Sequence, residues 1–376
     1  MEFKQLVKRR SGNKLLYWTN MDMMFEAYLA HESGHLEDDI PQTREPVWIL
    51  GKRYSAIHDF EAIRRDIRSR LWFSYRKGFV AIGDSSYTTD KGWGCMLRCG
   101  QMLIAQALIN LHLGRDWEWT PSCHDVRYLR LLKMFEDRRS APYSIHQIAL
   151  MGASEGKQVG DWFGPNTVAQ VLKKLSAYDE WSNLAVHVAL DNTIVVNEIR
   201  NLCTQERRGG VRGREWKPLA LIIPLRLGIN EINAVYINSL KTCFTMRQSI
   251  GVIGGKPNHA LYFIGCVGND VIFLDPHTTQ NIGFVERKEV DHERKIDASY
   301  HLSQASRSHI LHMDPSIAVG FFCKTENDFD SLCHDIKERF MLEKQPLFEL
   351  VENRHVPKGQ RSRQFDDSDE DFELLG

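Results

Sequence analysis

The stretch TTDKGWGCMLRCGQMLIAQAL, residues 88–108, places two cysteines four positions apart, directly behind a pair of glycines. From Cys95 onward, apolar and amide side chains recur at helical spacing, and Gly114 is a suitable stop. The pattern predicts a largely buried helix over 95–114 that begins at Cys95. Three interpretations of the cysteines are open at this point: a nucleophile, a pair of metal ligands, or two small residues of the core.

The overall composition indicates no charged partner. The 376 residues contain 48 basic and 49 acidic side chains, so no net field draws the chain to nucleic acid or to an anionic membrane. No window has the roughly 18 apolar residues of a spanning helix, and the N-terminus lacks the apolar region of a secretory signal. We therefore expect a cytoplasmic protein whose eight scattered cysteines are reduced.

The chain divides into a globular part and two polar ends. Residues 1–44 show no regular periodicity and are interpreted as an N-terminal arm, and 353–376 are interpreted as an acidic, disordered tail. Within 45–352, helical patterns at 57–77 and 164–186 come early and strands dominate later. This order favours an α+β domain over a βαβ dinucleotide-binding fold.

The position of Cys95 at a helix start favours chemistry. A thiol there faces unpaired N–H groups and the positive end of the helix dipole, which lower its pKa. Gly92 and Gly94 allow a sharp turn, and the free Cys95 amide can point at a developing oxyanion. This layout suits acyl transfer. Cys99 lies one turn further in, where a small packed residue is the expected role.

Two other interpretations of the cysteines compete with this one. Buried, inert cysteines are common, so the helix alone does not decide for a nucleophile. Structural zinc requires closely spaced pairs, whereas this sequence offers C-x-x-x-C and isolated Cys-His dipeptides at 123–124 and 333–334. We expect no metal site.

The stretch FLDPHTTQ, residues 273–280, supplies what a thiolate nucleophile needs. It follows two apolar runs that flank 268–270 and predict a hairpin. Residues two apart on a strand share a face, so Asp275 and His277 are expected side by side as orienter and base. His259, the nearest rival, has no acidic residue within two positions and is interpreted as a loop or capping residue.

Six segments of the globular part belong together: LWFSYRKGF (71–79), TTDKGWGCMLRCGQM (88–102), DWFGPNTVAQVLKKL (161–175), LRLG (225–228), SIGVIGGKPNHALYFIG (249–265) and FLDPHTTQ (273–280). In combination they resemble the autophagins, the cysteine proteases of autophagy that process a small ubiquitin-like modifier. The similarity runs from about residue 45 to about residue 351, in the order of the family. It implies a papain-like α+β fold with a small additional subdomain, in which the nucleophile opens a central helix.

The resemblance implies the catalytic roles. Cys95 is matched to the nucleophile, His277 to the general acid and base, and Asp275 to its orienter. In papain the orienting residue follows the histidine, so the order Asp then His is a mark of this family. Tyr75 is matched to the tyrosine that joins the Cys95 amide in the oxyanion hole, although its pattern alone indicates an aromatic side chain on a helix.

The resemblance also implies substrate contacts. Trp162 is matched to a tryptophan over the active-site groove, and residues 251–257, with Gly254, Gly255 and Pro257, to a gating loop. A slot between them excludes a Cβ, which explains cleavage after glycine. Arg226 is matched to a substrate-binding arginine, although an exposed ion pair would explain it equally well.

The implied partner is the ubiquitin-like modifier, both as a precursor and as its phosphatidylethanolamine conjugate. Neither reaction needs a cofactor or a metal. The enzyme would reach membranes only through the lipidated substrate, and we expect a monomer that binds no nucleic acid. In the tail, Phe372 and Leu375 follow an acidic run and resemble a modifier-docking motif, which would bind as an added strand. A solvated acidic tail is the simpler alternative.

Two rival functions share these residues. An inactive scaffold that only binds the modifier would not need Cys95, Asp275, His277 and Tyr75 together. A transglutaminase-like acyl transferase uses the same triad logic. The segments around Trp162 and 254–257 favour the autophagins over this second rival.

Overall fold

The computed structural model describes residues 37–38, 40–121, 123–206, 213–285, 297–340 and 345–354. Nearly all of the predicted arm 1–44 and tail 353–376, including Phe372 and Leu375, lies outside the described residues. Within these ranges, no helix is long and apolar enough to cross a membrane. Strand β1 (Glu37–Asp38) pairs with the main sheet, so part of the predicted arm belongs to the fold.

A single mixed sheet forms the centre of the molecule. Its neighbours are antiparallel, apart from the last pair, β9 with β5, which is parallel. β2 (Pro46–Ile49) adds to β11 and pairs with β3 (Lys52–Ser55). The strand order is β1, β14 (Ser306–His309), β12 (Asp270–Leu274), β11 (Leu261–Val267), β10 (Ser249–Gly254), β15 (Ser316–Cys323), β9 (Leu219–Arg226) and β5 (Ala185–Val188).

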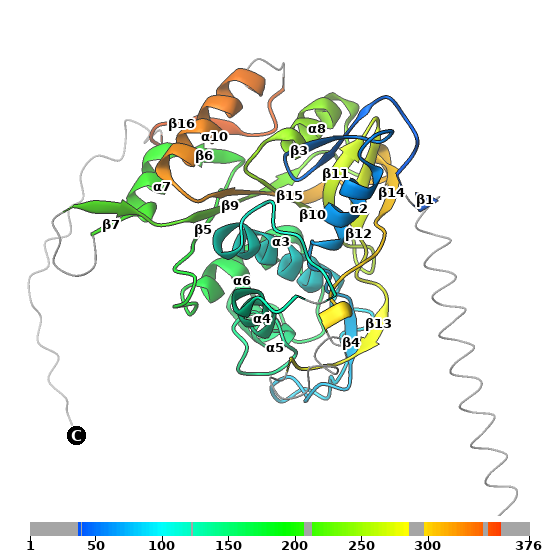
Figure 1. Ribbon diagram of the computed structural model, residues 1–376. Coiled ribbons are helices and arrows are strands. Elements are labelled where there is room, and N and C mark those ends of the chain that lie inside the picture. Colours follow the sequence, from blue (N-terminus) through cyan, green and yellow to red (C-terminus); the bar gives the residue numbers. More distant parts are fainter. Residues whose placement is uncertain are drawn as a thin grey trace, which may run out of the picture.

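Helices cover both faces of this sheet (Figure 1). Each face has its own cluster of buried apolar side chains. Because both faces of the central strands are buried, these strands consist almost entirely of apolar residues. The expected α+β class is confirmed. One face carries α2 (Phe60–Arg68), α3 (Cys95–His112), α4 (Val126–Lys133), α5 (Ile145–Met151) and α6 (Pro165–Ser176), and the other α7 (Val196–Cys203), α8 (Ile237–Thr245) and α10 (Glu326–Arg339).

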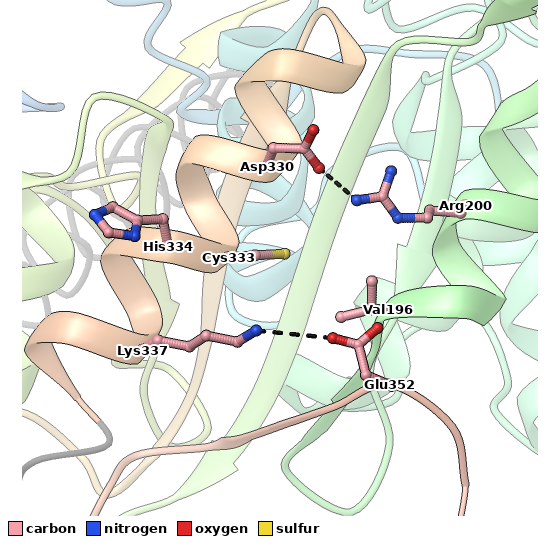
Figure 2. Close-up of a pocket in the computed structure, with 7 residues that line it drawn as sticks. All are labelled: Val196, Arg200, Asp330, Cys333, His334, Lys337 and Glu352. Carbon is pink, nitrogen blue, oxygen red and sulfur yellow. Dashed lines mark hydrogen bonds and ion pairs between the residues drawn. The ribbon is translucent and has the colours of Figure 1, made fainter.

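A small hollow lies on the α7 and α10 side, across the sheet from α3 (Figure 2). Its charged groups are already paired, Arg200 with Asp330 and Lys337 with Glu352. Burial raises the pKa of the Cys333 thiol to about 11, so this thiol stays protonated. The lining residues are Val196, Arg200, Asp330, Cys333, His334, Lys337 and Glu352.

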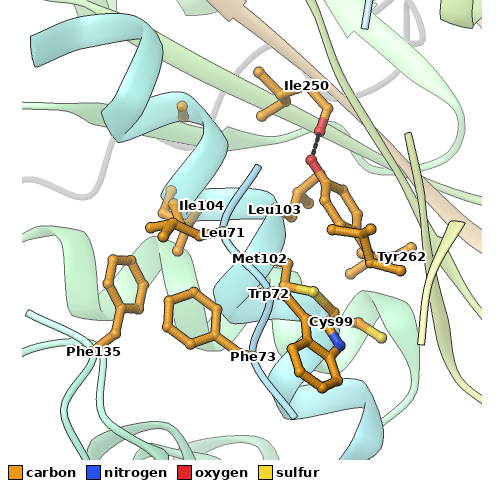
Figure 3. Packing of buried hydrophobic residues seen from close by; sticks show 14 of the residues in the cluster. Leu71, Trp72, Phe73, Cys99, Met102, Leu103, Ile104, Phe135, Ile250 and Tyr262 are labelled. Carbon is orange, nitrogen blue, oxygen red and sulfur yellow. Dashed lines mark hydrogen bonds between the residues drawn. The ribbon is translucent and has the colours of Figure 1, made fainter. Parts of the chain in front are cut away.

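The central helix α3 is buried along almost its whole length, as its pattern predicts. Cys99, Met102 and Leu103 pack against aromatic and aliphatic side chains from the segment before β4 (Tyr75–Lys77) and from β10 and β11 (Figure 3). Tyr262 on β11 donates its hydroxyl hydrogen to the Ile250 carbonyl, 2.7 Å away. The nucleophile candidate therefore sits on a rigid, closely packed element.

Two predicted helices are too long. The pattern at 57–77 is helical only over α2, and residues 75–77 form β4, which pairs in parallel with β13 (Thr279–Asn281). The pattern at 164–186 ends with α6 at Ser176, and residues 185–188 are β5. In both cases the residues after the helix include buried apolar side chains in strand or extended backbone. Their spacing continues the apolar pattern of the helix, so the sequence pattern does not show where the helix ends. The hairpin is confirmed, with Val267 opposite Asp270.

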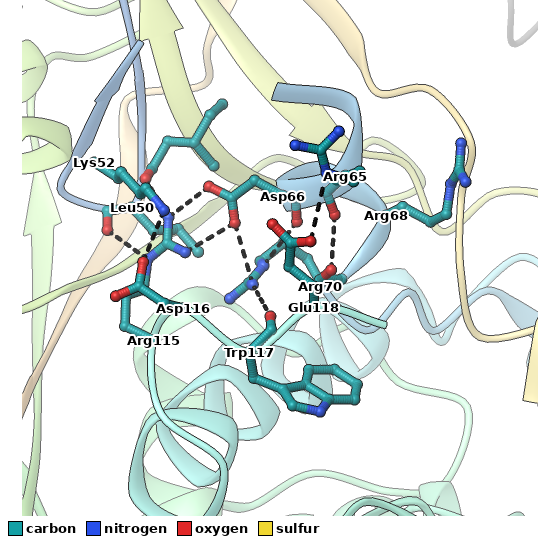
Figure 4. A network of polar contacts seen from close by, with 12 residues as sticks. Leu50, Lys52, Arg65, Asp66, Arg68, Arg70, Arg115, Asp116, Trp117 and Glu118 are labelled. Atoms are coloured by element: carbon teal, nitrogen blue, oxygen red, sulfur yellow. Dashed lines mark hydrogen bonds and ion pairs between the residues drawn. The ribbon is translucent and has the colours of Figure 1, made fainter. Parts of the chain in front are cut away.

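A buried polar network fixes α2 beside the segment that follows α3 (Figure 4). Asp66 accepts hydrogen bonds from both Nη atoms of Arg115, each over 2.8 Å. Arg70 lies 3.1 Å from the same carboxylate and also donates to the Trp117 carbonyl. Burial acts to raise the pKa of Asp66, but the two arginines hold it below its usual value. The network joins the chain on either side of the catalytic helix.

Candidate active site

Cys95 is the first residue of α3, and its side chain is fully buried. The residue before the helix, Gly94, provides no side-chain cap, so the first amides of the helix have no partner from that source. Gly92 adopts a φ of 85°, in the left-handed region that favours glycine. The expected sharp turn before the nucleophile is confirmed.

Asp275 and His277 are brought together by a turn. Both residues follow the end of β12 at Leu274, so the expectation that they share a strand face is wrong. Instead, Oδ1 of Asp275 accepts hydrogen bonds from the backbone N–H of His277 over 2.9 Å and from its Nδ1 over 2.5 Å. An aspartate that bonds the backbone two residues on is typical of such turns, and the same turn here delivers the imidazole to the carboxylate.

Tyr75 lies against His277, with ring centroids 5.5 Å apart and planes at 86°. The backbone N–H of Tyr75 donates to the Pro276 carbonyl over 2.8 Å. Trp72 Nε1 donates to the Asp275 carbonyl over 2.7 Å. Trp72 and the first residue of β4 therefore hold the carbonyls of Asp275 and Pro276 in the Asp-Pro-His turn.

Electrostatic interactions join Cys95 to both rings. Burial acts to lower the pKa of His277, but hydrogen bonding to Asp275 and the neighbouring Cys95 raise it to about 10. Burial and Cys95 raise the pKa of Tyr75 well above its usual value, so its hydroxyl remains a donor. Among the described residues, neither His277 Nε2 nor Tyr75 Oη has a hydrogen-bond partner other than the Cys95 thiol that acts on both rings, although both atoms are buried.

Asp275 remains ionised in this arrangement. Burial acts to raise its pKa, but the hydrogen bonds and charge of His277 hold it below the usual range. The charge of His259 contributes in the same direction. His259 follows the turn after β10 and donates its N–H to the Lys256 carbonyl over 3.0 Å, which confirms its loop position. No acidic residue is within two positions of His259 in the sequence, but in the structure its charge acts on Asp275.

Trp162 and Arg226 are the remaining candidate side chains. Trp162 precedes α6 and packs, half-buried, against the core cluster around α3. Arg226, at the exposed end of β9, donates through Nε to the Gly228 carbonyl over 2.8 Å, so its guanidinium holds its own loop.

The expected gating loop 251–257 is wrong in its first half. Residues 251–254 belong to β10 and pair with both β11 and β15. A Cβ on Gly254 would lie 2.7 Å from Ile317 Cγ2, so the sheet requires this glycine. Gly255 has a φ of 143°, and the turn that contains Pro257 follows it. Only residues 255–257 of the predicted loop lie outside the strand.

Sequence reasoning missed the buried charges beneath Cys95. Arg98, one turn into α3, is 1% exposed and donates to both oxygens of Asp90 and to Asp137. An arginine among Met, Leu and Cys on a buried helix was the available signal, because a buried charge needs a partner. The sequence does not reveal which carboxylates those partners are.

A model of the peptidase C54 catalytic domain matches residues 60–335. The chain belongs to this family. It is 49% identical to the cysteine protease ATG4B of Gallus gallus, over 94% of this chain and 100% of that protein. It is 48% identical to the cysteine protease ATG4A of Homo sapiens, over 84% of each.

The resemblance to the autophagins is confirmed by these comparisons, and this ATG4-family protein is a cysteine protease. The matched range contains Tyr75, Cys95, Asp275 and His277, the residues that the geometry brings together.

Proposed function

We infer that this ATG4-family protease cleaves after the C-terminal glycine of a ubiquitin-like autophagy modifier, both to mature its precursor and to release it from phosphatidylethanolamine. The observation that carries the inference is the convergence of His277 and Tyr75 on Cys95 at the start of α3. Both reactions are acyl transfers to a thiol followed by hydrolysis.

Each group of the site has a role in this chemistry. The Cys95 thiolate attacks the glycine carbonyl, and its amide and the Tyr75 hydroxyl stabilise the oxyanion. The protonated His277 gives its proton to the leaving amine, which departs as the acyl-enzyme forms. His277 then takes a proton from water, which attacks the thioester and frees Cys95. Asp275 orients the imidazole through Nδ1.

A closed site fits selection for glycine. Cys95 has no exposed surface, so a substrate reaches its sulfur only when a covering segment moves. We propose that Trp162 and the turn with Gly255 and Pro257 form the segment that covers Cys95. Gly254, the last residue of β10, would stay fixed in the sheet beside this turn. Arg226 is proposed to contact the modifier body. A slot of this kind admits a main chain without a Cβ.

The nucleophile on a central helix and the base beside a sheet support a papain-like fold. We also propose that the enzyme acts in the cytoplasm as a monomer.

The substrate inference is tested with a panel of modifier precursors and lipidated modifiers. Mass spectrometry should find products that end at the modifier's glycine, and the Cys95→Ala protein serves as the blank. Cleavage at another bond, or no cleavage of any member, would contradict the inference.

Phe372→Ala should weaken modifier binding and slow precursor processing, if the tail docks on the modifier. Loss of one anchoring side chain from such a motif costs about 10-fold or more in affinity. Hydrolysis of a small active-site probe should not change, because the tail is remote in sequence from the triad. Calorimetry measures the affinity. An unchanged Kd would remove the docking claim and leave the catalytic one intact.

A further inference from the structure

Asp90 is bonded to both segments that carry the proposed oxyanion donors. Its Oδ1 accepts from the N–H of Arg76, the residue after Tyr75, over 2.7 Å, and its own N–H donates to the Arg76 carbonyl over 3.3 Å. Its carbonyl accepts from Trp93 over 3.2 Å and from Gly94 over 2.8 Å, directly before Cys95. One residue thus connects β4 with the start of α3.

Arg98 fixes the Asp90 side chain. Its Nε donates to Oδ2 over 2.7 Å and its Nη2 to Oδ1 over 3.1 Å, in the two-pronged geometry that a guanidinium forms with a carboxylate. Its Nη1 donates to Asp137 over 2.9 Å and to Gln101 over 3.1 Å. Arg98 lies one turn after Cys95 on α3. This helix therefore fixes the Asp90 side chain, and the Asp90 carbonyl in turn fixes the residues directly before Cys95.

The packing leaves Asp90 no freedom to move. Its side chain is fully buried, and a Cβ on Gly94 would lie only 2.4 Å from its Oδ2. The carboxylate therefore lies against the backbone directly before the nucleophile. Its charge also contributes to the raised pKa of Tyr75, which keeps the phenol protonated. Burial raises the pKa of Asp90 above its usual value, while the charge and hydrogen bonds of Arg98 and the backbone N–H of Arg76 act to lower it.

We propose that Asp90 is a positioning residue that sets the separation between the Tyr75 hydroxyl and the Cys95 amide. The proposal rests on the proposed acyl-transfer function, in which these two groups bind one oxyanion. Loss of an oxyanion donor costs about 10²- to 10³-fold in kcat, and a donor displaced by a fraction of an ångström costs less. Asp90 would act only in the transition state, through the two donors.

Asp90→Asn keeps the shape of the side chain but turns an N–H group toward Arg98 or Arg76. We expect kcat for cleavage of a modifier precursor to fall about 10- to 100-fold while KM changes less than about twofold. Alkylation of Cys95 by iodoacetamide requires the thiolate and no oxyanion hole, so its rate should stay within about threefold. A site that is merely distorted would lose both rates together, and that result would overturn the proposal.

Asp137→Asn is the matched control. It also removes a carboxylate from Arg98, but within the described part of the chain Asp137 makes no hydrogen bond to Arg76, Trp93 or Gly94. We expect kcat per titrated Cys95 to change less than about threefold. An equal loss in both variants would show that only the charge balance of Arg98 matters, against the proposal. If Asp90→Asn does not fold, Arg98→Lys loosens the same carboxylate, and unchanged kcat in that variant would reject the idea.

Combination with Tyr75→Phe separates positioning from general damage. Tyr75→Phe alone should cost about 10²- to 10³-fold in kcat. Once that donor is gone, Asp90→Asn should cost at least threefold less than it does in the wild type, since coupled residues are non-additive. Full additivity would contradict the proposal. Failure of the wild type to cleave any precursor would instead contradict the proposed function, and the two failures are therefore distinct.

Discussion

Cys95→Ala is expected to lower kcat/KM for modifier precursor by at least about 10⁴-fold. Removal of the nucleophile leaves only binding and the oxyanion donors, which cannot form the acyl-enzyme. His277 and Tyr75 also lose the neighbour that raises the pKa of both rings, and we expect the folded structure to remain. Gel-based cleavage over several hours, with circular dichroism on the same sample, measures both properties.

Cys99→Ala is the matched control on the same helix. Cys99 is fully buried, and burial raises the pKa of its thiol well above the usual value, so it is a protonated core residue. Its loss leaves a small cavity worth about 1 kcal/mol, and activity should stay within a few-fold of the wild type. Equal loss of activity in both variants, with normal circular dichroism, would refute the assignment of Cys95 as the nucleophile.

The helix that begins at Cys95 could be predicted because all the needed information is local. Apolar spacing sets the helix over α3, and two glycines with no cap set its start. The pairing of Asp275 with His277 was also local, although the sequence suggested a strand face and the molecule uses a turn. Either geometry joins residues two apart, so the correct pair followed from the wrong local structure.

The parts that could not be predicted depend on long-range contacts. Tyr75 lies in a helical-looking pattern, and only its pairing with Thr279, about two hundred residues later, makes it a strand residue. The two carboxylates that bind Arg98 are Asp90, which is 8 positions before it in the sequence, and Asp137, which is 39 positions after it. Family resemblance supplied the proposed role of Tyr75, but no local pattern predicted the bonds of Asp90.

Asp275→Asn is the second change with a large expected effect. An amide can no longer stabilise the imidazolium, and it can turn the imidazole to the wrong tautomer, which costs about 10³- to 10⁴-fold in kcat in comparable triads. Asp270→Asn is the control, because Asp270 lies at the other end of β12 and pairs with Arg307 instead. Activity of that control should remain near the wild-type value.

The pH dependence gives this prediction its sharpest form. His277 has its pKa raised to about 10, so its proton, and with it the general acid, is present at neutral pH and is lost as pH rises through about 10. Wild-type kcat/KM should therefore show its alkaline limb there. In Asp275→Asn the limb should move toward the ordinary histidine value of about 6.5.

The raised pKa also has a consequence for stability. A histidine whose pKa is higher in the folded state stabilises the fold fully below about pH 6.5, and that contribution is lost as pH rises through about 10. The difference in Tm between wild type and Asp275→Asn should therefore be larger near neutral pH than above pH 10. Parallel rate profiles together with a pH-independent Tm difference would show that Asp275 does not hold the proton of His277, and the acid role of this histidine would then need another source.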